Sequence, residues 1–367
     1  MRPIAPIILK LALALLLLVP VGGCGFKDID KRFFVVGTGI DLSGNEEKPY
    51  RLTIQLAIPS PKIEPGTSKF QYETIDAISI AEGLRMLKAY VDKELDFGHC
   101  RIFIIGESLA RKNITSVLDW MVRRRDIQLV ANMAIGKPDA ASVLKIKPIS
   151  EQYPGNALLL SFGADGTESS YNYAESLSGF SRRLTEKGLD PALAIVKGDK
   201  NKGYIINEIA LMDKQKIKLV LSPDEAQMFN QLASRFTKSS MHGIYRHDGI
   251  VVAINQLHSR FRIENQDAQH LIKVNIRMKT VIEESSSSLM EKDLKPVEAK
   301  LEKSYEAEAT KLLAKIQKAN VDPLGFGLRY LAMNPGEGSW DNWQRIYPDA
   351  SFKVNVRLII EGTGLIW

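Results

Sequence analysis

The residue best suited to chemistry near the start of the chain is Cys24. It ends the tetrapeptide Val21-Gly22-Gly23-Cys24, which directly follows an apolar stretch at residues 11–20. A short basic region with Arg2 and Lys10, an apolar core and small residues at a cleavage point together indicate an export signal. A branched apolar residue, two small residues and a cysteine form the pattern of a bacterial lipobox. In that motif the cysteine thiolate is the nucleophile that accepts a diacylglycerol.

We therefore expect residues 1–23 to be a lipoprotein signal peptide and Cys24 to carry a diacylglyceryl thioether and an N-acyl chain. Membrane lipid would then be a partner of the chain through Cys24. A single acyl chain anchors only marginally, so the diacylglyceryl pair is what makes attachment durable. The alternative is an uncleaved anchor helix, or an ordinary signal peptide with a coincidental cysteine. The apolar stretch is about half of the roughly 20 residues that a spanning helix needs.

The second cysteine, Cys100, has no partner within the chain once Cys24 is acylated. It lies beside His99, just before the apolar run at residues 101–106. A reactive thiol needs exposure and a lowered pKa, and the sequence shows neither. We expect Cys100 to be a small buried residue at the start of a strand, and His99 to lie in a turn or core with its hydrogen bonds satisfied.

Other patterns of catalytic or metal chemistry are missing from the sequence. The five histidines form no HExxH motif, and there is no CxxC pair. His242 and His247 lie in a loop-like stretch and are expected to be solvated. Gly136-Lys137-Pro138 is not a phosphate-binding loop, and no GxSxG is present. We therefore predict no catalytic residue, no cofactor, no metal and no enzyme, although carboxylates are too plentiful for the sequence to exclude a catalytic pair.

The composition is that of a folded chain with more than one domain. The sequence has 367 residues, of which 45% are hydrophobic and 25% charged. This length predicts two or three domains. Two cysteines exclude a disulfide-stapled scaffold. The formal charge of +6 falls to +4 once Arg2 and Lys10 are removed, which is a poor signal for nucleic acid but suits a position near anionic lipid.

Hydrophobic periodicity predicts the elements that must position these residues. Apolar residues alternate with polar ones at residues 51–58, 271–280 and 353–360. One wet face per strand favours antiparallel pairing. More continuous apolar runs at residues 33–40, 101–106 and 129–136 predict central strands.

Helical spacing appears in four segments. They are Ile80 to Val91, Ala110 to Met121, a helix that begins at Ser222-Pro223-Asp224-Glu225, and a long helix through Leu301 and Ile316. The third start combines a serine cap, a proline and a glutamate that bonds back. The long helix must stop near Asn320, because Pro323 cannot continue it.

Together these elements predict an α+β protein with largely antiparallel mixed sheets flanked by helices. We expect an N-terminal α+β domain at residues 25–195 and a middle domain at 196–240. A C-terminal α+β domain at 241–367 would hold the long helix and a terminal strand.

Taken in order, the segments resemble the Ger(x)C lipoproteins, the C subunits of spore germinant receptors. The characteristic N-terminal stretches are Phe97-Gly98-His99 and residues 105–111. The strongest C-terminal piece is Asp322-Pro323-Leu324-Gly325-Phe326-Gly327, followed by a Trp340-Asp341-Asn342-Trp343 loop and Tyr347-Pro348. One departure is Gly25-Phe26-Lys27-Asp28, where the family usually has a Trp-Asp pair. Gly325 and Gly327 permit positive φ or close packing, and Phe326 between them suits a core position.

The resemblance implies a lipid-anchored receptor subunit on the outer face of the spore inner membrane. It implies assembly with two integral-membrane subunits, A and B, into a receptor required for nutrient-triggered spore germination. Whether this subunit itself binds the nutrient stays open, and no nucleic acid is expected. One alternative is a solute-binding lipoprotein of a transport system, which needs a concave cleft between domains. Another is a cell-wall or lipid hydrolase, which needs a cluster of catalytic groups.

Overall fold

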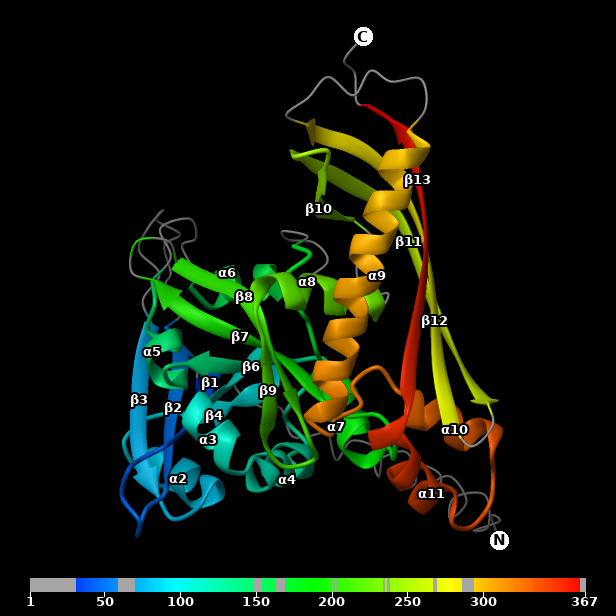
Figure 1. Ribbon diagram of the computed structural model, residues 1–367. Helices are drawn as coiled ribbons and strands as arrows, with labels where there is room; N and C mark the ends of the chain where they lie inside the picture. Colours follow the sequence, from blue (N-terminus) through cyan, green and yellow to red (C-terminus); the bar gives the residue numbers. More distant parts are fainter. Residues whose placement is uncertain are drawn as a thin grey trace, which may run out of the picture.

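The computed structural model describes residues 31–58, 70–147, 154–162, 169–199, 201, 203–233, 235, 238–266, 269–285 and 294–363. The signal segment and Cys24 lie outside the described residues. The described chain forms two β-sheets (Figure 1). The first sheet has the order β3-β2-β1-β5-β6-β7-β8-β9 with β4 beside β1, and the second has the order β10-β11-β12-β13.

Parallel strands form the centre of the first sheet. β1 pairs in parallel with β4 and β5, β5 with β6, and β6 with β7, and antiparallel strands extend the sheet on both sides. Side chains of β5 alternate between two cores, with Ile102 and Ile104 on one face and Phe103 and Ile105 on the other. The runs at residues 33–40 and 101–106 are therefore central strands, as predicted, whereas in the run at 129–136 the strand begins only at Asn132, after the exposed loop residues Leu129 and Val130. The strands are β1 (Arg32–Leu42), β2 (Tyr50–Ala57), β3 (Phe70–Ala77), β4 (Glu94–Asp96), β5 (Ile102–Gly106), β6 (Asn132–Lys137), β7 (Ala192–Asp199), β8 (Gly203–Met212) and β9 (Ile217–Leu221).

Helices cover both faces of this sheet, which is what strands that are apolar on both sides require. One face packs against α2 (Ile80–Leu87), α3 (Glu107–Lys112), α4 (Thr115–Arg123) and α7 (Leu177–Thr185). The other face packs against α5 (Ala140–Leu144), α6 (Pro154–Phe162) and α8 (Pro223–Leu232). A short helical turn, η3 (Phe97–His99), precedes β5.

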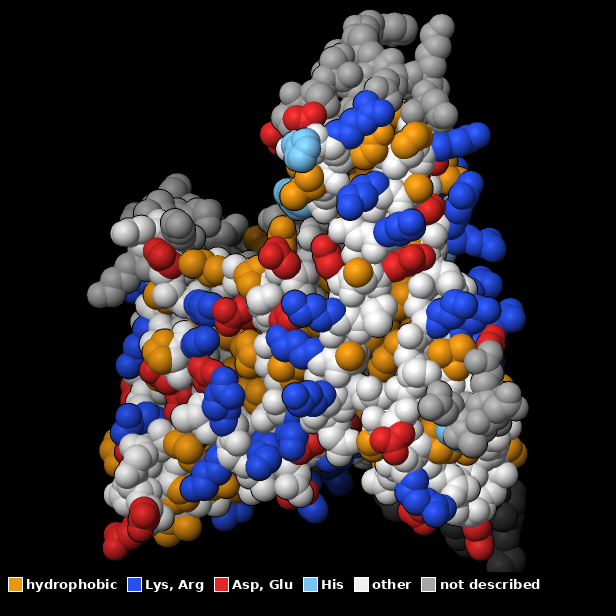
Figure 2. Space-filling model, viewed as in Figure 1, with side chains coloured by type: hydrophobic (Ala, Val, Ile, Leu, Met, Phe, Trp, Pro, Cys, Tyr) orange, Lys and Arg blue, Asp and Glu red, His pale blue; other side chains and the backbone are white. Residues whose placement is uncertain are grey.

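The second sheet wraps against one long helix (Figure 1). Its alternating strands are as predicted: the inward-facing residues are Ile272, Val274, Ile276 and Met278 on β12, and Val354, Val356, Leu358 and Ile360 on β13. Figure 2 shows Lys and Arg side chains along the margin that β12 and β13 occupy in Figure 1. The elements are β10 (Ser239–Tyr245), β11 (Asp248–Gln266), β12 (Gln269–Ser285), α9 (Lys295–Lys318), α10 (Phe326–Met333), α11 (Ser339–Ile346), η4 (Tyr347–Asp349) and β13 (Ser351–Gly362).

Pairing of β13 differs from the prediction. The exposed face of residues 353–360 favoured an antiparallel neighbour, but β13 pairs in parallel with β12. The connection from β12 to β13 includes the 24-residue helix α9, which runs back along the sheet and returns the chain to the same end. A crossover of this length is what a parallel pair needs.

The free edge of β13 is closed by glutamates of α9. The backbone N–H groups of Val356, Leu358 and Ile360 donate to the carboxylates of Glu306, Glu302 and Glu298, at 2.9, 2.8 and 2.8 Å respectively. Every second residue of a strand recurs after about 7 Å, and every fourth residue of a helix after about 6 Å. This near match lets one helix satisfy three successive edge donors. We call these three residues the glutamate ladder.

The predicted helices are mostly confirmed. α2 begins at Ile80, α8 has the predicted capping box with Ser222 and Glu225, and α9 ends just before Asn320, whose φ is 53°. The single helix expected from Ala110 to Met121 is instead two helices, α3 and α4, because extended backbone at Asn113 interrupts it.

One further difference concerns the C-terminal part, while the domain boundaries are not tested. The stretch around Trp340 is helix α11 and not a loop. Residues expected in a middle domain at 196–240 supply β8 and β9 to the first sheet, and α8 packs beside them. The boundaries stay predictions, because strand pairing alone does not define units that fold independently. Within the described ranges, no helix is both long enough and apolar enough to cross a membrane.

Removing one rung of the glutamate ladder should destabilise the protein. In Glu302→Ala the N–H of Leu358 loses its acceptor, and an unsatisfied buried donor costs about 1–3 kcal/mol. Glu302→Gln retains an oxygen acceptor and should cost less. The measurement is the free energy of unfolding in urea, with Glu308→Ala on the exposed side of the same helix as the matched control. Equal losses for Glu302→Ala and Glu308→Ala would contradict the role of the ladder.

Candidate functional site

Cys100 is an inert buried thiol, as predicted. Its Sγ lies 3.4 Å from the Thr38 hydroxyl and 3.5 Å from the carbonyl of Ile102. Burial raises the pKa of the Cys100 thiol to about 12. Its neighbour His99 lies in η3, is exposed, and sets its ring edge-on to Phe34 with centroids 4.8 Å apart. We considered a turn or the core as the position of His99, and the structure places it in a turn.

The next residues singled out in the sequence are His242 and His247, which we expected to be solvated. His242 lies in β10 and His247 in the turn between β10 and β11, so the stretch is a hairpin and not one loop. Both side chains are exposed. No three His, Cys, Asp or Glu side chains in the described ranges are grouped to hold a metal ion.

The most unusual buried group is the carboxylate of Asp322, which is 3% exposed. Its Oδ1 accepts hydrogen bonds from the backbone N–H groups of Gly325 and Phe326 at 2.9 and 3.0 Å, and its Oδ2 accepts one from Gly327 at 2.6 Å. These donors belong to the turn and first residues of α10. Burial nevertheless raises the pKa of Asp322 to about 7, and the nearby charge of Asp190 adds to the rise.

Asp322 also connects the two parts of the chain. Its N–H donates to Oδ2 of Asp190 at 2.7 Å, and the N–H of Asp190 donates to its carbonyl at 2.8 Å. The Arg183 guanidinium donates to the carbonyls of Asp190 and Pro323, at 3.0 and 2.9 Å. Lys214 Nζ lies 3.2 Å from Oδ1 of Asp190. We call this set of contacts the joint, because it links residues just before β7 to residues just after α9.

Two glycines make the joint possible. Gly188 has a φ of +74°, and a Cβ there would lie 2.4 Å from the carbonyl carbon of Gly327. A Cβ on Gly327 would lie 2.4 Å from Nε1 of Trp343. Phe326, which lies between Gly325 and Gly327, is buried against Phe261, with ring centroids 4.7 Å apart. The predicted roles of Gly325, Phe326 and Gly327 are confirmed, since Gly325 has a φ of +81°.

A cavity of about 770 Å³ opens at the joint. Asp190, Lys214, Asp322, Trp343 and Tyr347 are among its lining residues. Among the described residues that line it there is no serine, threonine, cysteine or histidine. Carboxylates and lysines dominate the polar part of this lining, and such a surface suits the binding of a small polar molecule.

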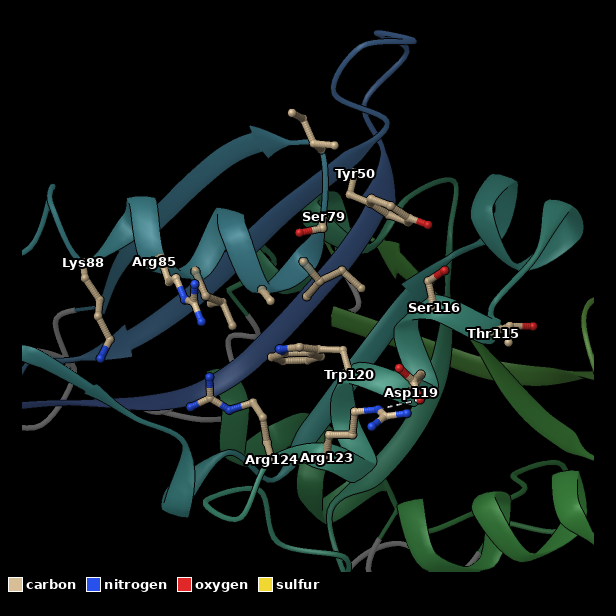
Figure 3. A pocket seen from close by; sticks show the side chains of 14 residues that line it. Tyr50, Ser79, Arg85, Lys88, Thr115, Ser116, Asp119, Trp120, Arg123 and Arg124 are labelled. Atoms are coloured by element: carbon tan, nitrogen blue, oxygen red, sulfur yellow. Dashed lines mark hydrogen bonds and ion pairs between the residues drawn. The ribbon is translucent and has the colours of Figure 1, made fainter.

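A second cavity, of about 790 Å³, lies between α2 and α4 (Figure 3). Trp120 lies between the two helices, and Arg85 and Lys88 from α2 face Arg124 at the end of α4. The guanidinium carbon of Arg124 lies 4.5 Å from the centroid of the Phe97 ring, and the same guanidinium group pairs with Asp126. Of the described lining residues, one is a carboxylate, Asp119, which pairs with Arg123 at 2.8 Å. The cavity therefore combines an aromatic wall with excess positive charge and suits an anionic ligand.

Sequence reasoning did not find either cavity. The joint was visible only as the family stretch at residues 322–327, without its partners Gly188 and Asp190. The second cavity left one signal, the Arg123-Arg124-Arg125 triplet at the end of a helix.

The raised pKa of Asp322 gives the joint a pH dependence. The folded state holds the proton up to about pH 7, whereas an unfolded aspartate loses it near pH 4. The stabilising effect of the protonated form is therefore complete below about pH 4 and is lost as the pH rises through about 7.

We expect the stability of the wild type relative to Asp322→Asn to fall by up to roughly 4 kcal/mol across this window, at about 1.4 kcal/mol per pKa unit. Urea unfolding at a series of pH values measures it. The exposed Asp349→Asn is the control, and its curve should run parallel to the wild type. If the stability of Asp322→Asn changes with pH in the same way as that of the wild type, the raised pKa of Asp322 is disproved.

Comparisons with known proteins agree with the two-part architecture. Residues 25–198 match a family model described as the spore germination protein N-terminal domain, and residues 207–364 match one described as spore germination B3/GerAC-like, C-terminal. A putative spore germination protein YfkR of Bacillus subtilis (strain 168) is 20% identical, with 98% of each chain covered. Spore germination protein KC of the same organism is 22% identical over 80% of this chain and 78% of that one.

A solved structure has the same fold. The crystal structure of the GerBC protein superposes with a TM-score of 0.60 at 16% identity, covering 88% of this chain and 97% of that one. The family resemblance seen in the sequence is thus confirmed. Because the two family models together cover most of its length, this chain belongs to the Ger(x)C family of spore germination proteins.

Proposed function

We propose that the chain is the lipid-anchored C subunit of a spore germinant receptor. The observation that carries the proposal is the lipobox at Cys24 placed directly before the first family domain, which begins at residue 25. A tether at this position holds both sheets close to a bilayer. Tethering raises the effective concentration of the subunit toward partners in the same membrane. The partners proposed are the two integral-membrane subunits, A and B, on the outer face of the spore inner membrane.

The role we propose is one of binding and assembly, without catalysis. At the joint, Lys214 and Asp190 pair with each other at 3.2 Å, and in the α2–α4 cavity the carboxylate of Asp119 is held by Arg123. The joint supports an assembly role, because hydrogen bonds from both parts of the chain fix the second sheet against the first. A fixed arrangement of this kind suits a subunit that presents one surface to several partners.

A second candidate function is a solute-binding lipoprotein, and the cavity at the joint is the observation that favours it. Its volume of about 770 Å³ lies in the range of small-molecule sites. Calorimetry of the mature chain with amino acids and sugars separates the two functions. We expect no tight one-to-one binding. Such binding, lost in Lys214→Met, would favour solute delivery.

Loss of the chain should abolish nutrient-triggered germination through its cognate receptor. A spore strain that lacks the chain is complemented with the wild type or with Cys24→Ala, and germination is followed by the fall in optical density. The wild type should restore germination, whereas Cys24→Ala should restore little and should leave the membrane fraction after a high-salt wash. Normal germination without the chain would reject the role. A Cys24→Ala chain that stays with the washed membranes would reject the tether.

A further inference from the structure

Four strands of the first sheet begin at the same edge. β1 is parallel to β4 and β5, and β5 is parallel to β6. Parallel strands run in one direction, so their first residues share an edge of the sheet. The segments that lead into these strands are residues 88–93, 97–101 and 124–131, and Lys31 leads into β1. We call the surface formed by these segments the strand-start edge.

The strand-start edge exposes large apolar side chains. Tyr90 is 66% exposed, Leu129 is 54% exposed and Val130 is 64% exposed. Leu129 and Val130 are neighbours in the loop before β6, and Tyr90 lies in the loop before β4. Exposed apolar residues scattered singly need no explanation. Here they share one edge and lie among cations.

Cations outnumber free carboxylates on the same surface. Lys93, Arg101 and Arg125 have no ion pair within the described part of the chain, although Lys93 lies over the ring of Phe33. The acidic residues are mostly paired: Glu94 lies 3.3 Å from Lys88, Asp96 pairs with Arg32, and Asp126 pairs with Arg124. Asp92 is the remaining carboxylate of these segments and is exposed. The net result is a positive surface with apolar side chains in it.

The α2–α4 cavity adds to this charge. α2 and α4 end where the loops of the strand-start edge begin, and their last turns carry Arg85 and Arg123. Figure 3 shows Arg85, Lys88 and Arg124 together at one end of the cavity. This end of the cavity therefore adjoins the strand-start edge. Lys88 and Arg124 are paired with Glu94 and Asp126, so the charge that the cavity adds is that of Arg85, which is exposed and has no ion pair in the described part of the chain.

We propose that the strand-start edge lies on an anionic phospholipid surface, with Tyr90, Leu129 and Val130 at the level of the headgroups. Cations attract anionic lipids, while aromatic and aliphatic side chains enter the interface. The choice of lipid over an acidic protein segment rests on the proposed acylation of Cys24. Lys31 precedes β1 at this edge, and an extended chain spans at most about 3.6 Å per residue. The seven positions from Cys24 to Lys31 thus place the acyl chains within roughly 25 Å of this edge.

The test uses the fragment of residues 25–367, which lacks Cys24 and so carries no acyl group but keeps every described residue. Flotation measures its partitioning onto vesicles of equimolar phosphatidylglycerol and phosphatidylcholine, and onto vesicles of phosphatidylcholine alone. We expect binding to the anionic vesicles that weakens with added salt. The triple variant Lys93→Gln, Arg101→Gln and Arg125→Gln should lower the partition coefficient about 100-fold, at about fivefold per cation. Val130→Ser should lower it several-fold.

Matched controls come from the second sheet. Arg260, Arg262 and Arg277 are exposed on its outer face, so the triple variant with glutamine at these positions removes the same charge. Ile244→Ser removes an aliphatic side chain that is 66% exposed on β10. Both controls should leave partitioning unchanged. Equal losses in the two triple variants, or no preference for anionic vesicles, would overturn the proposal.

Binding to a polyglutamate peptide but not to vesicles would also overturn it and would assign the edge to an acidic protein segment. None of these results depends on acylation. A negative result for lipid binding by the strand-start edge can therefore be told apart from a negative result for acylation at Cys24, which the Cys24→Ala fractionation tests.

Discussion

The arrangement of the two sheets depends on a buried carboxylate that must be satisfied. Asp322 has almost no access to water, and a carboxylate in that position is costly unless donors surround it. Three backbone N–H groups at the start of α10 supply those donors, so the turn and the helix are held in one geometry. The same residue exchanges hydrogen bonds with Asp190 of the other part of the chain. Local helix geometry and the packing of the two halves are thereby fixed together.

Close backbone approach is the second requirement of that arrangement. Gly188 and Gly327 lie so near to each other that a Cβ on either would overlap the other chain segment or Trp343. The N–H of Leu328 then reaches the carbonyl of Gly188 at 2.9 Å. The hydrophobic core continues from the first sheet through α8 to α9 and the second sheet. A continuous core and a polar joint together explain how two differently built sheets form one body.

Much of the fold could be predicted from local patterns. Alternation gave the inward faces of β12 and β13, the capping box gave the start of α8, and Pro323 gave the end of α9. These features depend on neighbouring residues. The break at Asn113 is local, since the Asn113 side chain accepts from the N–H of Thr115 at 2.8 Å, but the apolar spacing runs across it. The parallel pairing of β13 and the partners of Asp322 depend on residues far away in the sequence, which periodicity does not report. The lipid site at Cys24 remains a prediction, and both cavities are lined by segments far apart in the sequence that only folding brings together.

The glutamate ladder has a consequence for self-association. Edge strands are natural templates onto which another chain can add a strand. On β13 the donors that would recruit an extra strand are already occupied by Glu298, Glu302 and Glu306. An intruding strand would have to displace three carboxylates and the helix that carries them. The chain is thus guarded, at this edge, against growth into fibres.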